Sequence, residues 1–328
     1  MTERAAWLSA ALFAAAVSIP AATPAAATPP LLWGGDAEGG APFVEADPRN
    51  PSVVRGMDVE VAGILARGIG REPRFVQVAF TSIDASVERG DFAVGLSGVE
   101  DTPPRRAAHA LTVPYYEFRE VLTVRGRDRQ RFRNLSELRG KRVGTLSGTI
   151  AYELLVRGAG ANGYEVVSYD DDVHPYSDLA AGRLDGVVLD HIIAQRALRH
   201  VHGLVIQPDP LARGRYVGVL ARTNTALRDR FDGILTAAMR DGWLEAILRR
   251  WNVWDDEQPR LFASVLGAAA PAPSAAATLP PAQTPAPAPG APAGALARTV
   301  AYLPGLFRAS LVTLVLSCLA MALAVGAG

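Results

Sequence analysis

The chain has 328 residues, and its 33 Lys and Arg residues balance its 33 Asp and Glu residues, so the formal net charge is zero. A balanced chain offers no broad basic surface, and we therefore expect no nucleic-acid partner. The hydrophobic content of 49% is concentrated at the two ends, where Ala-rich stretches flank a middle with the composition of a soluble domain. The length is typical of about two domains.

The N-terminal segment, residues 1–27, is predicted to be a secretory signal peptide. An apolar run over residues 5–19 is followed by small residues at 25–27 that fit an A-x-A cleavage site. The charged start that a signal peptide usually has is weak here, because Glu3 offsets Arg4. The segment could therefore also be retained as an uncleaved membrane anchor. The single cysteine, Cys318, excludes an intrachain disulfide, and an exported domain must then be stable through its core alone.

Short apolar runs alternate with amphipathic segments between residues 31 and 259, which predicts an α/β architecture with mostly parallel sheets. About nine expected strands indicate two sheets rather than one. The expected strands cover residues 31–35, 74–79, 93–96, 120–124, 142–146, 165–169, 186–189, 204–207 and 216–221. The expected helices cover residues 58–68, 82–89, 149–157, 176–181, 190–200 and 227–251, with a brief turn at 136–140.

The C-terminal part changes composition abruptly. Residues 260–298 are predicted to be a semi-rigid linker, because most of this stretch is Ala and Pro, and Pro favours extended backbone. Residues 299–328 are predicted to form a transmembrane helix, since the last twenty residues carry no charge and are long enough to cross a bilayer.

The most informative segment follows the expected strand at 93–96. A Thr102-Pro103-Pro104-Arg105 turn stands shortly before Pro114-Tyr115-Tyr116. An Arg on such a connection can bind a carboxylate through two parallel N–H···O bonds. The alternative is an Arg that is simply exposed to solvent, as most are.

Further short motifs occur in the same order along the middle of the chain. They are Gly34-Gly35-Asp36-Ala37-Glu38 with Pro42-Phe43, Gly56-Met57-Asp58-Val59-Glu60-Val61-Ala62, Val143-Gly144 with Ser147-Gly148-Thr149, Leu184-Asp185-Gly186-Val187-Val188-Leu189-Asp190, and Asp241-Gly242-Trp243-Leu244. Together with the Arg105 segment, this order resembles the family 3 extracellular solute-binding proteins, the polar amino-acid receptors of ABC importers. The resemblance covers nearly all of residues 31–254.

The resemblance implies a two-lobed periplasmic-binding-protein fold of type II for residues 28–259, with a hinge between the lobes. Lobe 1 is expected to comprise about residues 31–117 and 218–254, and lobe 2 about residues 122–213. The implied function is a non-enzymatic periplasmic receptor that binds a polar amino acid or similar zwitterion between the lobes.

A zwitterion needs a partner for each of its charges once both leave water. The resemblance implies that Arg105 binds the carboxylate, with help from N–H groups around Ser97 and Gly98, and that Asp190 binds the ammonium. Asp190 has a second reading as the N-cap of the helix that follows it. Phe80 matches a position that stacks on the ligand in the family, although the sequence alone favours core packing for this residue. The full expected ligand-binding set is Asp36, Glu38, Phe80, Ser97, Gly98, Glu100, Arg105, Thr149 and Asp190.

Three departures from the family pattern affect this site. Gly39-Gly40 replaces an aromatic residue, Ile150 replaces a second hydroxyl residue beside Thr149, and Glu100 stands where Ser or Thr is common. A carboxylate at Glu100 repels the ligand's carboxylate unless it pairs with Arg105, Arg106 or a cationic group of the ligand. We therefore expect Glu38 and Glu100 to bias the site toward a cationic or amine-bearing ligand, with a rim pair between Glu100 and Arg106 as the alternative.

The segment from Tyr302 to Leu314 resembles the opening of a polar amino-acid ABC permease. We therefore expect a receptor–permease fusion tethered to the inner membrane, with the permease and its ATPase subunit as partners. Two alternatives stay open: a dehydratase-like enzyme on the same fold, and the ligand-sensing domain of a membrane receptor.

The five histidines are scattered and lack the spacing of metal ligands. The run Asp170-Asp171-Asp172-Val173-His174 is predicted to be a charged loop, because nothing near it in sequence closes a coordination sphere. No P-loop, nucleophile elbow or zinc motif is present in the sequence. We accordingly expect no metal, no cofactor and no catalytic residue.

Overall fold

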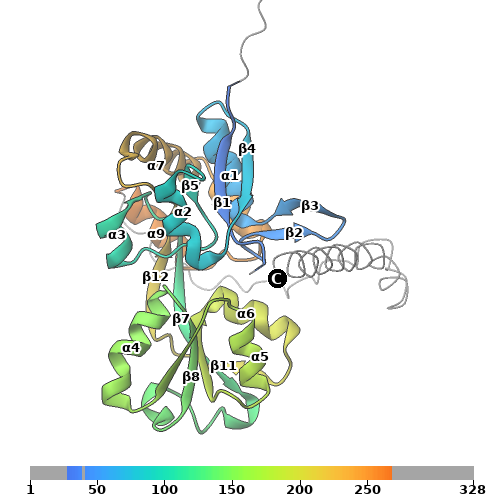
Figure 1. Cartoon of the computed structure of the whole chain (residues 1–328), viewed down its shortest axis with the longest axis vertical. Helices are drawn as coiled ribbons and strands as arrows, with labels where there is room; N and C mark the ends of the chain where they lie inside the picture. The colour runs from blue at the N-terminus through green and yellow to red at the C-terminus, as the bar shows by residue number, and fades with distance from the viewer. Residues whose placement is uncertain (1–27, 39–40, 268–328) are drawn as a thin grey trace, which may run out of the picture. The chain divides into compact units, whose positions relative to one another are not determined.

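Two β-sheets organise the chain in the computed structural model, which describes residues 28–38 and 41–267 (Figure 1). The first sheet has the strand order β4-β1-β5-β13-β6, and the second has the order β11-β7-β10-β8-β9 with β12 paired to β7. Each sheet with the helices packed on it is called a lobe below. The mixed α/β architecture expected from the alternating pattern is confirmed.

Lobe 1 is built on a parallel core, because β1 pairs with β4 on one side and β5 on the other. Strand β13 joins antiparallel to β5 and β6. Helix α1 packs against both α7 and α8. The elements are β1 (Leu31–Gly35), β2 (Glu45–Asp47), β3 (Asn50–Arg55), α1 (Met57–Gly68), β4 (Pro73–Gln77), α2 (Ile83–Arg89), β5 (Val94–Gly95), α3 (Pro103–Ala108), β6 (Ala110–Leu111), β13 (Val219–Leu220), α7 (Thr225–Arg240) and α8 (Trp243–Arg250).

Lobe 2 also has a parallel part, in which β8 pairs with β9 and β10, while β7 runs antiparallel to β10, β11 and β12. Its elements are β7 (Tyr116–Arg125), β8 (Arg142–Leu146), α4 (Ile150–Asn162), β9 (Glu165–Tyr169), α5 (His174–Ala180), β10 (Gly186–Asp190), α6 (His191–His200), β11 (Leu204–Ile206) and β12 (Ala212–Tyr216). Parallel strands bring their carboxyl ends to one edge, and this edge of lobe 2 contributes the residues after β8, β9 and β10 to the site.

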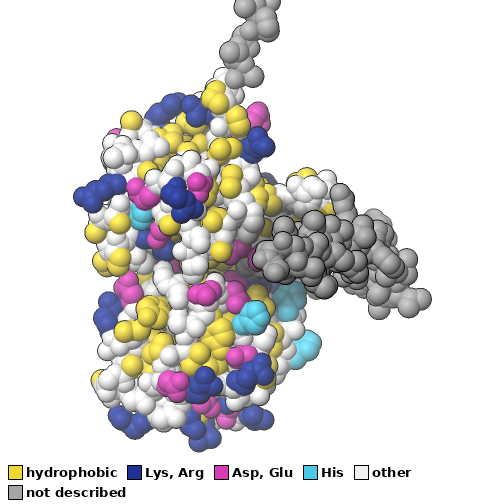
Figure 2. Space-filling view, in the orientation of Figure 1, with side chains coloured by type: hydrophobic (Ala, Val, Ile, Leu, Met, Phe, Trp, Pro, Cys, Tyr) yellow, Lys and Arg dark blue, Asp and Glu magenta, His cyan; other side chains and the backbone are white. Residues whose placement is uncertain are grey.

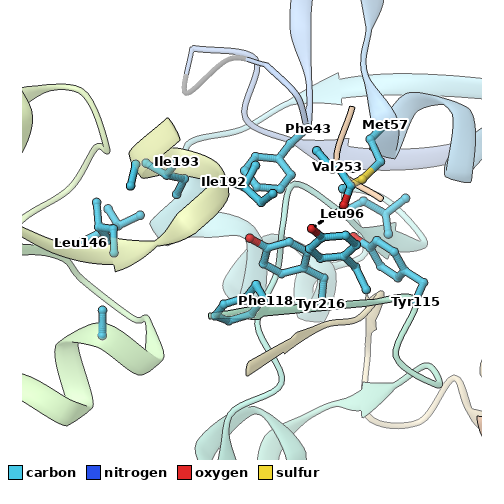
Figure 3. Close-up of a cluster of buried hydrophobic side chains, with 14 of the residues drawn as sticks. Phe43, Met57, Leu96, Tyr115, Phe118, Leu146, Ile192, Ile193, Tyr216 and Val253 are labelled. Atoms are coloured by element: carbon cyan, nitrogen blue, oxygen red, sulfur yellow. Dashed lines mark hydrogen bonds between the residues drawn. The ribbon is translucent and has the colours of Figure 1, made fainter. Parts of the chain in front are cut away.

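Strands β7 and β12 form the antiparallel connection between the lobes (Figure 1). An aromatic cluster packs around them: the ring of Tyr216 stacks on Phe118 at 4.6 Å and on Tyr116 at 5.4 Å, and meets Phe43 edge-on at 5.3 Å. Figure 3 shows the rings of Phe43, Tyr115, Phe118 and Tyr216 gathered in one place. All five rings are buried, so the crossing strands share one apolar core with lobe 1.

The structure corrects four expectations about local elements. The helix expected over 227–251 is two helices, because Gly242 adopts a left-handed conformation (φ 78°) between α7 and α8. The Thr102 turn is the N-cap of a short helix, α3, whose first residues are Pro103 and Pro104. The hairpin of β2 and β3 was not expected. Helix α9 (Gln258–Val265) lies in what was expected to be linker from residue 260.

The predicted signal peptide, most of the predicted linker and the predicted transmembrane helix lie outside the described residues. Within residues 28–38 and 41–267, no helix is both long and apolar enough to cross a bilayer. The transmembrane helix at 299–328 therefore stays a prediction.

Candidate functional site

A cavity of about 430 Å³ is lined by residues of both lobes. Eight of the nine expected ligand-binding residues line it, and Arg105 is the exception. Figure 2 shows acidic side chains gathered on this face near the junction of the two lobes. No Lys or Arg lines the cavity in the described part of the chain. The seven acidic residues that line it are Asp36, Glu38, Glu100, Asp170, Asp171, Asp172 and Asp190.

Asp36 follows β1 and organises the loops on the lobe 1 side. Its carboxylate accepts hydrogen bonds from the Phe80 N–H at 2.9 Å, the Gln77 amide at 3.1 Å and the Glu38 N–H at 2.9 Å. These bonds hold Phe80 at the cavity wall and anchor the start of the segment that carries Glu38. Asp36 thus shapes the site through the loops that it ties together.

Ser97 and Gly98 line the cavity, but their N–H groups are directed elsewhere. Both donate to one oxygen of Asp58, at 2.8 Å and 2.7 Å, and the Tyr115 hydroxyl donates to the other oxygen at 2.8 Å. Gly98 has a φ of 64°, which a residue with a side chain rarely adopts. Asp58 is fully buried, and burial raises its pKa to about 6 although the three hydrogen bonds oppose the shift. In this structure both N–H groups donate to Asp58, and their expected help in binding a ligand carboxylate stays a prediction.

The Arg105 guanidinium is held by its own lobe. Its Nε donates to both carboxylate oxygens of Asp84, at 3.1 Å and 2.9 Å, and its Nη1 donates to the Glu100 carbonyl at 2.9 Å. The guanidinium also lies 5.9 Å from the centre of the Phe80 ring. The side chain is 6% exposed. Sequence reasoning missed Asp84, which lies on α2, 21 residues before Arg105.

Glu100 joins the two lobes. Its carboxylate accepts the N–H of Ile150, the first residue of α4 in lobe 2. The side chain is 3% exposed, and burial, with a further contribution from the charge of Asp190, raises its pKa to about 8. The expected rim pair with Arg106 is wrong, because the Arg106 guanidinium binds Asp101.

Thr149 lines the cavity as the N-cap of α4. Its hydroxyl donates to the Leu146 carbonyl at 2.7 Å and accepts the Tyr152 N–H at 3.1 Å. The hydroxyl therefore serves the helix start, as a Thr in this position commonly does. Its expected contact with a ligand carboxylate stays a prediction.

Asp190 ends β10 and begins α6, so the N-cap reading is confirmed. Its Oδ1 accepts the N–H groups of Ile192 and Ile193, at 2.8 Å and 2.9 Å. The residue also lines the cavity, and neither of these bonds uses Oδ2. Burial raises its pKa to about 6, with the Ile193 N–H, the nearby Tyr216 hydroxyl and the Ile192 N–H opposing the shift. The binding of a ligand ammonium by Asp190 stays a prediction.

Glu120 is a functional candidate that sequence reasoning missed. It lies on β7 directly opposite Asp190 and is completely buried. Neither carboxyl oxygen makes a hydrogen bond, although the Ala151 N–H lies near enough to favour the charged form. Burial, then Glu100 and Asp190, raise its pKa well above the usual range. An acid inside the apolar run of β7 was the signal available in the sequence.

The loop after β9 supplies the remaining acidic residues. Asp171 binds the imidazole of His174, and Asp172 forms a buried ion pair with Arg196 of α6. Among the described residues, no group of His, Cys, Asp and Glu side chains is arranged to hold a metal ion. The charged loop is therefore a wall of the cavity, with ion pairs that fix its position.

Comparison with known proteins places this geometry in a family. Residues 35–253 match the bacterial extracellular solute-binding proteins, family 3. The chain belongs to that family. The ABC transporter arginine-binding protein 1 of Escherichia coli (strain K12) is 28% identical over 64% of this chain and 86% of its own length.

Solved structures show the same fold. A mutant of ArgBP from T. maritima is 27% identical, with a TM-score of 0.61, over 67% of this chain and 94% of that chain. An ancestral amino acid-binding protein, described as a precursor of cyclohexadienyl dehydratase, has a TM-score of 0.59 at 19% identity, over 67% of this chain and 94% of that chain. This chain and both solved structures share the two-lobed fold.

Proposed function

We propose that this chain is the extracytoplasmic receptor of an ABC importer, and that it binds a small cationic amino acid or a closely related amine in the interlobe cavity. The observation that carries the proposal is the lining of the cavity: seven acidic residues, and no Lys or Arg among the described residues. Two of the seven, Glu100 and Asp190, are buried without an ion pair to Lys or Arg, which is costly, and a ligand that brings positive charge removes that cost.

The apolar walls of the cavity complete the argument. Phe43, Phe80, Leu146 and Ile193 line it between the acidic residues. Such a surface suits a short aliphatic ligand with a charged nitrogen at one or both ends. Asp190, with Oδ2 outside its helix-capping bonds, is the proposed partner of a primary ammonium. The arginine-binding relatives support a ligand of this charge.

The delivery step is proposed from the family relationship and from the C-terminal sequence. The receptor would present its ligand to a permease with an ATPase subunit, and the segment from Tyr302 onward is proposed to begin a fused permease in the inner membrane. A tether of this kind raises the local receptor concentration to about the millimolar range. Uptake of labelled ligand by cells that express the complete gene, compared with cells lacking the region after residue 298, tests delivery.

Calorimetric titration tests the binding. The purified full chain is titrated with L-arginine, L-lysine, L-ornithine, their decarboxylated amines, and L-glutamate as the anionic control. We expect one or more of the cations to bind and glutamate to give no heat of binding. Binding of glutamate with no response to any cation would overturn the proposal.

A dehydratase is the second candidate, and one observation favours it. Glu100 lines the cavity with a pKa of about 8, so it holds a proton near neutral pH and could act as a general acid. Incubation with arogenate or prephenate, followed by detection of an aromatic product, tests this reading. Turnover that disappears in Glu100→Gln would support it, and absence of product would leave the receptor proposal alone.

A further inference from the structure

Whether the cavity can bind a ligand carboxylate depends on the hydrogen-bond donors that line it. This step rests on the proposed function, because it assumes that a small cation occupies the interlobe cavity. A carboxylate taken out of water needs hydrogen-bond donors or a cation, and without them it is strongly disfavoured. A carboxylate ligand therefore requires free donors among the described residues that line the cavity.

The donors on the lobe 1 side are already engaged, apart from Nη2 of Arg105, which makes no hydrogen bond within the described residues. The N–H groups of Ser97 and Gly98 donate to the buried Asp58 carboxylate. The Arg105 guanidinium binds Asp84 and the Glu100 carbonyl and does not line the cavity. An ion pair with two N–H···O contacts is a strong interaction, and a ligand would have to displace it. Lobe 1 offers a carboxylate little that is free.

The donors on the lobe 2 side are at the start of α4 and at His174, whose Nδ1 contacts Asp171 at 2.6 Å. A helix N-terminus attracts an anion, because its first N–H groups lack partners within the helix. Here the Ile150 N–H is bound by Glu100, and the Ala151 N–H faces Glu120. The Thr149 hydroxyl is used by the helix itself. The Glu100 carboxyl group thus occupies the end of the helix, and the Glu120 carboxyl group lies close by without a hydrogen bond.

The position of Glu100 makes this arrangement specific. The residue lies in lobe 1, bridged to Tyr216, and its side chain reaches the helix of lobe 2. It therefore links the lobes through a carboxyl group, at a place where a bound carboxylate ligand could do the same. A second carboxylate there would lie close to Glu100, whose charged form is already disfavoured by burial and by Asp190, and to Glu120, whose charged form is disfavoured by burial and by Glu100 and Asp190.

We propose that Glu100 takes the place of the ligand's carboxylate, so that the preferred ligand is an organic cation without one. The class is a primary amine or guanidinium carried on a short aliphatic chain, which includes the decarboxylated forms of cationic amino acids. Such a ligand supplies the positive charge that the cavity lacks, and it needs no binding site for a carboxylate. Its cationic nitrogens pair with Asp190 and with the acidic loop after β9.

Three ligand pairs that differ only in the carboxylate test this proposal: L-arginine with agmatine, L-lysine with cadaverine, and L-ornithine with putrescine. The purified full chain is titrated with all six at pH 7. In the pair that binds most tightly, we expect the amine to bind at least about tenfold more tightly than the amino acid, since an unpaired carboxylate carries a cost of that size.

Variants of Glu100 test whether this residue causes the preference for the amine over the matching amino acid. In Glu100→Ser, the helix N-terminus is released, and the amino acid should gain affinity relative to its amine by about tenfold. Glu100→Gln keeps the shape and the contact with the helix N-terminus but removes the ability to ionise, and it should give a smaller change in the same direction. Asp101→Ser is the matched control, because Asp101 binds Arg106 and does not line the cavity. It should leave the ratio unchanged.

The outcomes separate the two proposals. An amino acid that binds the unaltered chain as tightly as its amine, or more tightly, overturns the inference about Glu100 and leaves the receptor proposal standing. Failure of all six cations to bind overturns the receptor proposal itself. The comparison within the unaltered chain decides the question even if a variant fails to fold.

Discussion

Two regions of the molecule bury carboxyl groups in opposite ways. In lobe 1, Asp58 lies among three donors and is fully satisfied. Between the lobes, Glu100, Glu120 and Asp190, called the cleft acids below, lie close to one another, and Glu120 has no hydrogen bond at either oxygen. Burial is nearly complete in both regions, so burial alone does not distinguish a structural acid from a functional one.

The difference lies in what compensates the charge. The Asp58 carboxylate receives two N–H groups and a hydroxyl, and these fix the loop of Ser97 and Gly98 whether or not a ligand is bound. The cleft acids receive a few N–H groups from helix starts and repel one another. Their missing partner is a positive charge, and the cavity that Glu100 and Asp190 line gives that charge a place to bind.

The pH dependence of stability should show the largest effect. The pKa of Glu100 is about 8 in the folded chain and about 4.5 when exposed, so the unfolded chain loses this proton first as the pH rises. Stability of the ligand-free chain should therefore fall between about pH 4.5 and pH 8, by on the order of a few kcal/mol, and then level off. Asp58 and Asp190 add to this fall up to about pH 6.

Urea unfolding at a series of pH values measures this dependence. Glu100→Gln removes one of the titrating groups and should reduce the fall above pH 6 to the part that Glu120 contributes. A parent profile that is level from pH 5 to pH 8 would show that the cleft acids are ionised in the free protein, and the contrast with Asp58 would then be lost.

Removal of Asp58, the acid with three hydrogen-bond donors, should lower the stability of the fold by nearly as much. Asp58→Ala leaves the N–H groups of Ser97 and Gly98 and the Tyr115 hydroxyl without their acceptor, and stability should fall by about 3 kcal/mol. Asp58→Asn keeps an acceptor oxygen for both N–H groups and should lose less than half as much. Denaturant midpoints measure both, and equal losses in the two variants would argue against the hydrogen-bond account.

Removal of a cleft acid should act on binding instead. Asp190→Asn should weaken the binding of the best cationic ligand by about 30-fold, which corresponds to about 2 kcal/mol. Stability should change little, because Asn is as good an N-cap as Asp. Titration and thermal unfolding of the same sample separate the two effects. Undiminished affinity in a folded variant would exclude Asp190 as the ammonium partner.

The smallest expected effect is a gain in folding stability when Glu120 is replaced. Glu120→Met replaces a buried carboxyl without hydrogen bonds by an apolar side chain of similar size, and should stabilise the ligand-free chain by about 1 kcal/mol. The matched control is Glu117→Met on the same strand, where the carboxylate pairs with Arg213 and Arg215 and no gain is expected. A loss of stability in Glu120→Met would mean that Glu120 has a partner after all.

Much of the fold was predicted from the sequence because the signals are local. The strands Leu31–Gly35, Arg142–Leu146 and Glu165–Tyr169 begin and end as expected, since apolar runs bounded by charged or glycine residues define them. Eight of the nine expected ligand-binding residues line the cavity, because the resemblance placed them at strand ends and loop turns, whereas Phe43, Leu146, Ile193 and the acidic loop after β9 were not expected there. Asp190 was open to both of its readings from the start, and the N-cap is one that a sequence pattern can show.

The hydrogen-bond partners were decided by the tertiary structure. Asp84 reaches Arg105 from another helix, Asp58 takes the N–H groups of Ser97 and Gly98 from 39 and 40 residues away, and Glu100 reaches across to lobe 2. The sequence by itself determined where strands and helices form and that a carboxyl-rich site lies between two lobes. Which acid is satisfied and which is left for a ligand depends on the elements that the topology brings together, because a buried polar group is stabilised only by donors within hydrogen-bond reach.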